Sequence, residues 1–176
     1  MVRLAGAGAV ALAAVIVVSV LTGGSVSGSP CQASNVLVGH RVSAFRAPTL
    51  DNTTVRAPWS QHHAGVLIFF ASWCGPCQRE MPEVTAYLRT HSLTPVQIVG
   101  VDALDARGAA RSFVARDAVT FPVAFDPNGK LTTGEFRFQT VPETVFVDAT
   151  GVVRIVYYGA IPTRCLASDV AALKSS

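Results

Sequence analysis

The sequence predicts an α/β domain in which helices cover a central sheet, and three observations predict it. A continuous apolar run at residues 65–71 is typical of a strand buried on both faces of a sheet. Segments with helical spacing of apolar residues alternate with such runs along the chain. Two further apolar runs, joined by Ala149-Thr150-Gly151, predict a hairpin near the C-terminus. The resulting order of elements is typical of a layered α/β architecture.

The first half of the domain begins with an expected hairpin. Residues 48–52 form an extended segment that runs into a turn, and residues 53–55 return as a short strand. Gly65 to Ala71 is the buried strand. A helix follows from Gly75-Pro76, because proline suits the first turn of a helix, and Pro82 is expected to kink it. Its inner face is expected to carry Met81, Val84, Tyr87 and Leu88.

The second half continues with a strand at residues 96–101. Asp105 is predicted to cap a helix that runs through Ala118. Strands are expected at 144–148 and 152–158, and a terminal helix from Pro162. The middle helix is expected to bury Ala110, Phe113 and Val114 and to expose Arg107, Arg111 and Arg116.

Length and charge restrict the classes of function. The chain has 176 residues, and after its N-terminal segment the remainder suffices for one domain with a core but not for two. The net charge of +3 is too small to indicate nucleic acid or an anionic membrane surface as a partner.

The N-terminal segment predicts export. Arg3 precedes an uncharged apolar run from Leu4 to Leu21, and a stretch of small polar residues follows up to Pro30. We therefore place a signal or membrane anchor with its linker at 1–30 and the folded domain at 31–176. An uncleaved anchor is favoured, with the domain outside the cytoplasmic membrane by the positive-inside rule. The alternative is a secreted or periplasmic protein whose signal is cleaved.

The sequence Trp73-Cys74-Gly75-Pro76-Cys77 places two thiols one helical turn apart after the buried strand. A cysteine at a helix N-terminus faces unpaired backbone N–H groups and the positive end of the helix dipole, which stabilise its thiolate. Cys74 is therefore the expected attacking thiol, and Cys77 the thiol that resolves its mixed disulfide. A zinc site would need a second ligand pair, which neither the histidines nor the other cysteines supply; no metal and no cofactor are expected.

Cys31 and Cys165 are the two remaining cysteines. In an oxidising compartment they can form a structural disulfide that ties the start of the domain to the terminal helix. Two unpaired thiols, or lipidation of Cys31, are the alternatives.

Several motifs together resemble the thioredoxin superfamily, and within it the membrane-tethered extracytoplasmic TlpA/ResA/CcmG (DsbE)-like group. The motifs are the stretch 71–77, then Glu80-Met81-Pro82, a strand–helix insert over 102–121, and the stretch 141–148. The resemblance covers residues 44–173. It implies a thioredoxin-like fold with a central mixed sheet, helices on both faces, an extra N-terminal hairpin and the central insert.

The resemblance also implies site residues. Val141-Pro142 would be a cis peptide bond against the dithiol, leaving the Val141 backbone free to pair with an extended substrate. Trp73 and Glu143 would flank the same substrate. Plain thioredoxins bury an aspartate where this chain has Ile68, so Glu80 is the expected proton acceptor for Cys77. For Glu143, an ordinary surface charge is the equal alternative.

The function expected from these residues is an extracytoplasmic thiol–disulfide oxidoreductase that reduces protein disulfides. Gly-Pro between the cysteines favours a potential near about −270 mV. The resemblance implies a membrane thiol carrier as electron donor and the haem-site cysteines of apocytochrome c as acceptor. The alternatives are an oxidase or isomerase for secreted proteins, and a non-catalytic anchored binding module. A copper chaperone and a peroxidase fit the cysteine spacing poorly.

Overall fold

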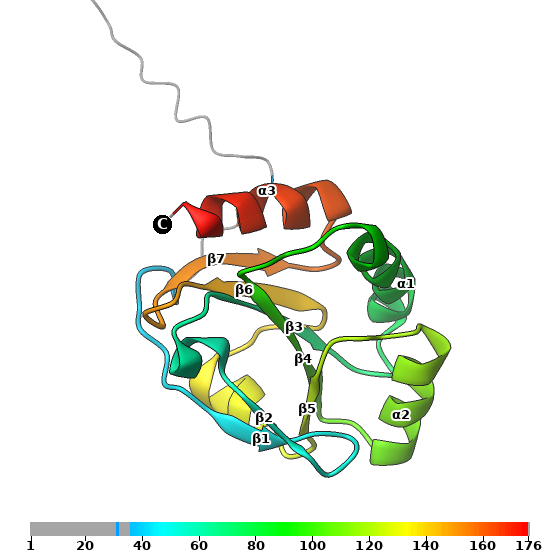
Figure 1. Cartoon of the computed structure of the whole chain (residues 1–176). Helices are drawn as coiled ribbons and strands as arrows, with labels where there is room; N and C mark the ends of the chain where they lie inside the picture. Colours follow the sequence, from blue (N-terminus) through cyan, green and yellow to red (C-terminus); the bar gives the residue numbers. More distant parts are fainter. Residues whose placement is uncertain (1–30, 32–35, 176) are drawn as a thin grey trace, which may run out of the picture.

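The structure of the chain is a computed structural model that describes residue 31 and residues 36–175. A five-stranded mixed sheet forms its centre, in the order β5-β4-β3-β6-β7 (Figure 1). Its strands are β3 (Gly65–Phe70), β4 (Gln97–Ala103), β5 (Val123–Asp126), β6 (Glu143–Val147) and β7 (Val153–Tyr158). Strands β3, β4 and β5 run parallel, whereas β6 is antiparallel to both β3 and β7.

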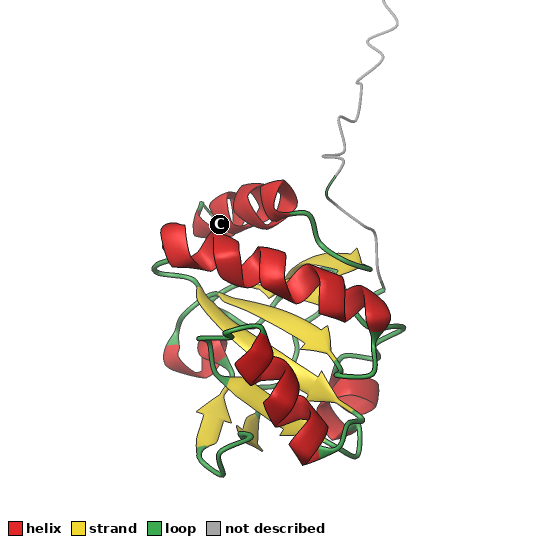
Figure 2. Cartoon of the chain, turned by 90° about the vertical axis from the view of Figure 1, so that its right-hand side faces the viewer, coloured by secondary structure: helices red, strands yellow, loops and turns green. Residues whose placement is uncertain are grey.

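Three long helices pack through one hydrophobic cluster: α1 (Gly75–Thr90), α2 (Arg107–Arg116) and α3 (Thr163–Lys174). Figure 2 shows them in front of the strands. The cluster joins their buried residues, such as Met81, Phe113 and Leu166, to Ile68 and Phe70 of β3. Because alternate residues of a strand point to opposite faces, these side chains mark the helical face of the sheet.

The opposite face carries a second cluster built around Leu67, Phe69 and Val101. It is covered by a hairpin of β1 (Arg46–Pro48) and β2 (Thr54–Arg56) and by two short helical segments, the 3-10 helix η1 (Pro58–Gln61) and the π-helix η2 (Lys130–Glu135). Trp59 from η1 and Phe136, which follows η2, pack in a T-shaped arrangement in this cluster. The second face of the sheet thus carries short helical segments instead of long helices.

Strand β3 leads into the Cys74–Cys77 motif, and the two hydrophobic clusters bury both of its faces. Residues Val66 to Ala71 have no exposed surface. Burying a large aliphatic or aromatic side chain stabilises the fold by about 1.5–3 kcal/mol, so the end of this strand is a firm support for Cys74. The expected hairpin, buried strand, first helix and terminal helix are all present. Helix α1 continues through Pro82 to Thr90.

Three details differ from the sequence-based expectations. Strand β5 was not expected, although it forms one edge of the central sheet. Helix α2 has Ala106, not Asp105, at its N-cap, and it ends at Arg116. Arg107 is half-buried and donates to the carbonyl oxygens of Thr49 and Leu50, and Val114 is only half-buried.

The predicted anchor and linker lie outside the described residues. Within residues 36–175, no helix has the length and apolar character needed to cross a membrane.

Candidate active site

Cys74 and Cys77 form a disulfide at the start of α1, with an S–S distance of 2.01 Å. Cys74 is the N-cap residue, and its sulfur accepts a hydrogen bond from the backbone N–H of Cys77 at 3.1 Å. Cys77 has no exposed surface, whereas Cys74 retains 4%. A backbone N–H that donates to the Cys74 sulfur favours its thiolate. The geometry thus suits Cys74 to attack a substrate and Cys77 to resolve the mixed disulfide.

The residues just before Cys74 are held by the loop after β4. Both carboxylate oxygens of Asp105 accept from Ser72, one from its backbone N–H at 2.6 Å and one from its hydroxyl at 3.0 Å. The indole N–H of Trp73 donates to the Leu104 carbonyl at 3.2 Å. Gln78 donates to the Ser72 carbonyl from α1. The backbone that presents Cys74 is therefore fixed from both sides.

A cleft of 390 Å³ opens beside the dithiol. Its walls are residues 73–76 on one side and residues 138–141 on the other. Trp73 remains 59% exposed at its rim, and Val141-Pro142 is a cis peptide bond, as expected. The backbone N–H of Val141 lies in a loop, and within the described part of the chain it donates to no backbone carbonyl there. The cleft can accept an extended peptide beside Cys74 with a backbone donor available to it.

Glu80 lies one turn after Cys77 on α1 and is buried. One carboxylate oxygen accepts from the backbone N–H of Ile161 at 2.7 Å, and the other has no hydrogen-bond partner. Burial raises the pKa of Glu80 to about 7, Ile161 lowers it and the charge of Glu83 raises it. A carboxyl that titrates near neutral pH is suited to proton transfer.

Glu143 is also buried, which excludes the alternative of an ordinary surface charge. It begins β6 opposite Phe69, and one of its oxygens accepts from the backbone N–H of Gln139 at 3.2 Å. Burial raises its pKa to about 7, opposed by the Gln139 hydrogen bond. Its position, directly after Pro142, ties the wall of the cleft to the central sheet.

The structure adds Asp102, a carboxyl that the sequence analysis did not single out. It lies in β4, in register with Phe70, and is fully buried. The available signal was an acidic residue at the end of the apolar run Val99-Gly100-Val101. The sequence predicts Asp105 as a helix cap. In the structure its carboxylate instead accepts hydrogen bonds from Ser72, which lies just before α1.

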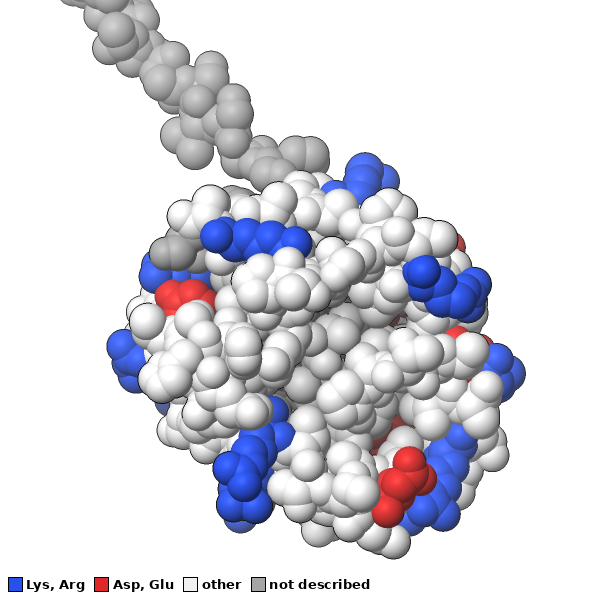
Figure 3. All heavy atoms as spheres, in the orientation of Figure 1, with Lys and Arg blue, Asp and Glu red and all other residues white. Residues whose placement is uncertain are grey.

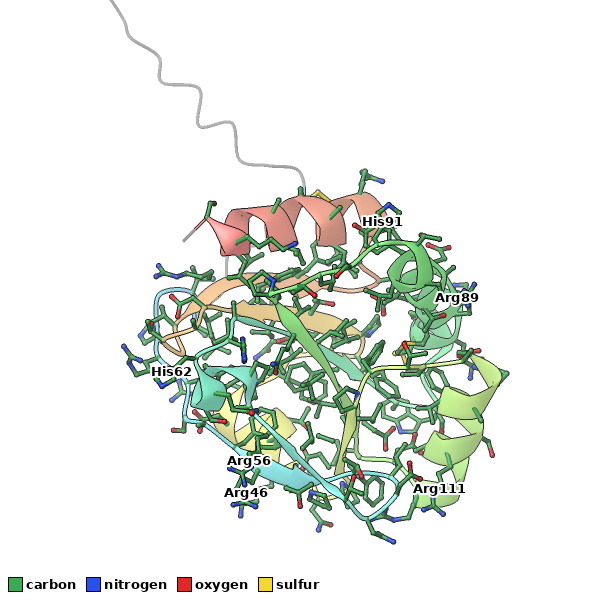
Figure 4. The ribbon with its side chains drawn as sticks, viewed as in Figure 1. Arg46, Arg56, His62, Arg89, His91 and Arg111 are labelled. Carbon is green, nitrogen blue, oxygen red and sulfur yellow. A yellow bond between two sulfur atoms is a disulfide. The ribbon has the colours of Figure 1, made fainter. Side chains whose placement is uncertain are left out.

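Cys31 and Cys165 lie far from the dithiol in sequence and are joined in a second disulfide, with 5.1 Å between their Cα atoms. Both residues are buried, and Cys165 belongs to the first turn of α3. The sulfur bond is visible at the top of α3 in Figure 4.

No group of three metal-ligating side chains gathers within residue 31 and residues 36–175. Figure 4 shows His62 and His91 well apart, on opposite sides of the molecule. On the face shown in Figure 3, basic side chains are spread around the rim and form no continuous patch.

A dithiol at a helix start, opposite a cis-proline loop on a mixed sheet, defines the class of thioredoxin-like thiol–disulfide oxidoreductases. The comparisons agree with it. The profile of the AhpC/TSA family matches residues 38–156, and the chain belongs to this family. Sporulation thiol-disulfide oxidoreductase A of Bacillus subtilis is 24% identical over 70% of this chain and 76% of its own length. The ResA protein of Oceanobacillus iheyensis is 28% identical over 64% of this chain and 58% of its own length.

Solved structures show the same similarity. DsbF of Mycobacterium tuberculosis is 33% identical, with a TM-score of 0.65 over 73% of this chain and 94% of that protein. A thiol:disulfide interchange protein DsbE from Chlorobium tepidum is 27% identical, with a TM-score of 0.64 over 78% of this chain and 96% of that protein. The protein is therefore a thiol–disulfide oxidoreductase of the ResA and DsbE type.

Proposed function

We propose that this oxidoreductase acts outside the cytoplasmic membrane as a reductant of protein disulfides, with Cys74 attacking and Cys77 resolving. The observation that carries the direction is the buried carboxyl of Glu80, one turn from Cys77 and with one oxygen unpartnered. Above neutral pH this group is charged, and negative charge near a thiol disfavours the thiolate. That favours the disulfide over the dithiol, and a couple with a stable disulfide is a reductant.

The exchange itself needs only the two cysteines. The Cys74 thiolate attacks one sulfur of a substrate disulfide, forms a mixed disulfide and releases the other substrate sulfur as a thiolate that takes up a proton. Cys77 then attacks Cys74, which expels the second substrate thiolate and leaves the Cys74–Cys77 disulfide. Glu80 is the proposed acceptor of the Cys77 proton in this second step. Trp73, Val141, Pro142 and Glu143 are proposed to bind or orient the substrate strand.

The two cysteines can be separated experimentally. Protein starting at about Pro30, which keeps the Cys31–Cys165 disulfide, is expected to reduce insulin disulfides in the presence of dithiothreitol. Cys74→Ser should abolish turnover, because no attacking thiolate remains. Cys77→Ser should accumulate mixed disulfides with substrate, detected by mass spectrometry. A Cys74→Ser variant that turns over at the wild-type rate would exclude this mechanism. No turnover by the protein with both cysteines intact would favour a binding module instead.

The export proposal rests on residues 1–30, with an uncleaved anchor preferred to a cleaved signal. The Cys31–Cys165 disulfide supports an oxidising compartment, where structural disulfides persist. One structural neighbour, 27% identical, is described as a secreted disulfide oxidoreductase of Mycobacterium tuberculosis. Protease added to intact spheroplasts should therefore degrade the domain, and membrane fractions should retain it. Full protection from protease would contradict the proposal.

The proposed acceptor is the pair of haem-site cysteines in apocytochrome c, and the proposed donor is a thiol carrier in the membrane. A substrate with a Cys-x-x-Cys-His disulfide in an extended chain fits the open cleft beside Cys74. The reduced protein should reduce such a peptide faster than a scrambled peptide with the same disulfide. An oxidase for secreted proteins remains the competing function, and it would react in the opposite direction with the same peptides.

A further inference from the structure

Asp102 has an environment that the exchange mechanism does not use. It is fully buried, and neither of its oxygens is reached by an N–H or O–H donor. Its strand neighbours at the same level are Phe70 in β3 and Phe125 in β5. An isolated ionised carboxylate in such surroundings costs several kcal/mol, so a carboxyl there is neutral or paired.

Asp105 follows Asp102 at the end of β4. Asp102 is in register with Phe70 of β3, and Asp105 accepts hydrogen bonds from Ser72, two residues beyond Phe70. Asp105 also acts on Asp102 through its charge and a side-chain hydrogen bond. Asp105 accepts three hydrogen bonds, from the Ser72 N–H, the Ser72 hydroxyl and the Ala106 N–H, as an ionised carboxylate does. Two carboxyl groups that face each other are compatible only when one of them carries a proton and donates it to the other. Asp102, which has no donor of its own, is the one that carries it.

The charges that act on Asp102 from the described elements have the same sign. They come from Asp105 in the loop after β4 and from Asp126 at the end of β5. On α2, the guanidinium of Arg107 is occupied by the carbonyl oxygens of Thr49 and Leu50 and lies over the Phe125 ring. From β3, the neighbour in register is the uncharged Phe70.

We propose that Asp102 and Asp105 form a proton-sharing carboxyl pair that holds Ser72 and thereby positions Cys74. With the proton present, Asp102 donates to Asp105, and Asp105 keeps both of its contacts with Ser72. When the proton leaves, two like charges face each other in a buried site, and Asp105 is driven away from Ser72. The reactivity of Cys74 then falls even though more of it is thiolate. Asp102 is a positioning residue in this proposal, which rests on the dithiol exchange described above.

The pH dependence of Cys74 reactivity tests the pair. Burial, followed by the charge and hydrogen bond of Asp105 and the charge of Asp126, raises the pKa of Asp102 to about 8. The alkylation rate of Cys74 in the reduced protein, divided by the thiolate fraction from ultraviolet absorbance, should fall about threefold to tenfold as pH rises through 8. A displacement of about 1 Å can slow a reaction about 100-fold, and the displacement expected here is smaller. Steps from Glu80 and Glu143 should appear lower, near pH 7.

Variants separate the pair from other groups. Asp102→Asn keeps a donor toward Asp105 but cannot ionise, so the normalised rate should lose its step near pH 8. Asp102→Leu removes the donor and should lower the normalised rate at every pH. The matched control is Asp169→Asn, a buried carboxyl in α3 with one unpartnered oxygen, which should keep the wild-type step. An Asp102→Asn protein that retains the step overturns the proposal.

A measurement on the unaltered protein covers the case in which a variant fails to fold. With labelled aspartate, the side-chain carbon of one buried residue should titrate near pH 8, and the Ser72 amide nitrogen should shift with the same midpoint. A Ser72 amide that does not respond in that range overturns the proposal, whereas loss of insulin turnover by all forms of the protein would instead contradict the proposed function.

Discussion

Glu80 is the residue on which the chemistry of the dithiol depends most after the cysteines themselves. Its Ile161 contact fixes one oxygen and ties α1 to the segment that enters α3. Its second oxygen is buried without a hydrogen-bond partner. An unsatisfied buried polar atom costs free energy, so such an atom calls for a functional explanation. Glu80 thus makes a structural hydrogen bond with one oxygen and can hold a proton on the other. A substitution by glutamine, which has the same shape but cannot ionise, separates these two roles.

Glu80→Gln is expected to lower the pKa of the Cys74 thiol, because it removes a nearby negative charge and keeps an acceptor for Ile161. The shift should be about 0.5–1 unit, typical of one neighbouring charge. Thiolate absorbance against pH measures it. The exchange rate above pH 7 should also fall, since Cys77 loses its proton acceptor. An unchanged or higher pKa would contradict the role given to Glu80.

At the scale of elements, the sequence was most informative where the local pattern and the tertiary structure agree. The buried strand β3, the helix start at Gly75-Pro76 and the hairpin β6–β7 follow from apolar runs, proline and turn residues. Strand β5 was missed because only four residues, Val123–Asp126, separate a proline from a turn. The prediction of Asp105 as the helix N-cap was wrong because capping preferences reflect only the local sequence. In the structure Asp105 instead accepts a hydrogen bond from Ser72, 33 residues away.

The burial of three carboxyl groups could not be predicted from the sequence either. Glu80, Asp102 and Glu143 each have a polar side chain that the sequence alone would place at the surface. The family resemblance drew attention to Glu80 and Glu143, but neither pattern nor spacing indicated Asp102. Their burial results from strand register and helix packing, which bring together residues distant in the chain.

The terminal helix offers a test of the second disulfide. Cys31 and Cys165 are predicted to be paired in the exported protein, since their sulfurs are bonded in the structure and both are buried. Non-reducing peptide mapping of protein purified from the cell envelope should recover the linked peptides. The double variant Cys31→Ser, Cys165→Ser should lose about 2–5 kcal/mol of unfolding free energy. Free thiols at both positions would refute the pairing.

At the scale of the whole molecule, the buried carboxyls make stability depend on pH. The pKa values of Glu80, Asp102 and Glu143 are raised in the folded state, first of all by burial. The folded protein therefore binds more protons than the unfolded chain between about pH 4 and 8, and stability falls as pH rises through that window. Asp148, whose pKa is lowered, acts in the opposite direction only at more acidic pH.

The expected result is a free energy of unfolding several kcal/mol higher at pH 5 than at pH 8.5, from urea titrations of the oxidised protein, because each unit by which a pKa is raised contributes about 1.4 kcal/mol. Asp102→Asn should reduce this difference, because it removes one of the titrating groups. The control Asp51→Asn, at an exposed turn, should leave it unchanged. Stability that rises between pH 5 and pH 8.5 would show that these carboxyls are ionised without cost in the folded protein.

The reduction potential of the Cys74–Cys77 couple tests the central claim most directly, because it fixes the direction in which the site works. It is measured by equilibrating the protein with defined glutathione mixtures and quantifying the oxidised fraction. Gly75-Pro76 and the acidic residue at position 80 both favour the disulfide, so the expected potential lies below about −200 mV. A potential near about −120 mV, typical of a strong oxidant, would contradict the reductase and leave the fold and the dithiol site unaffected.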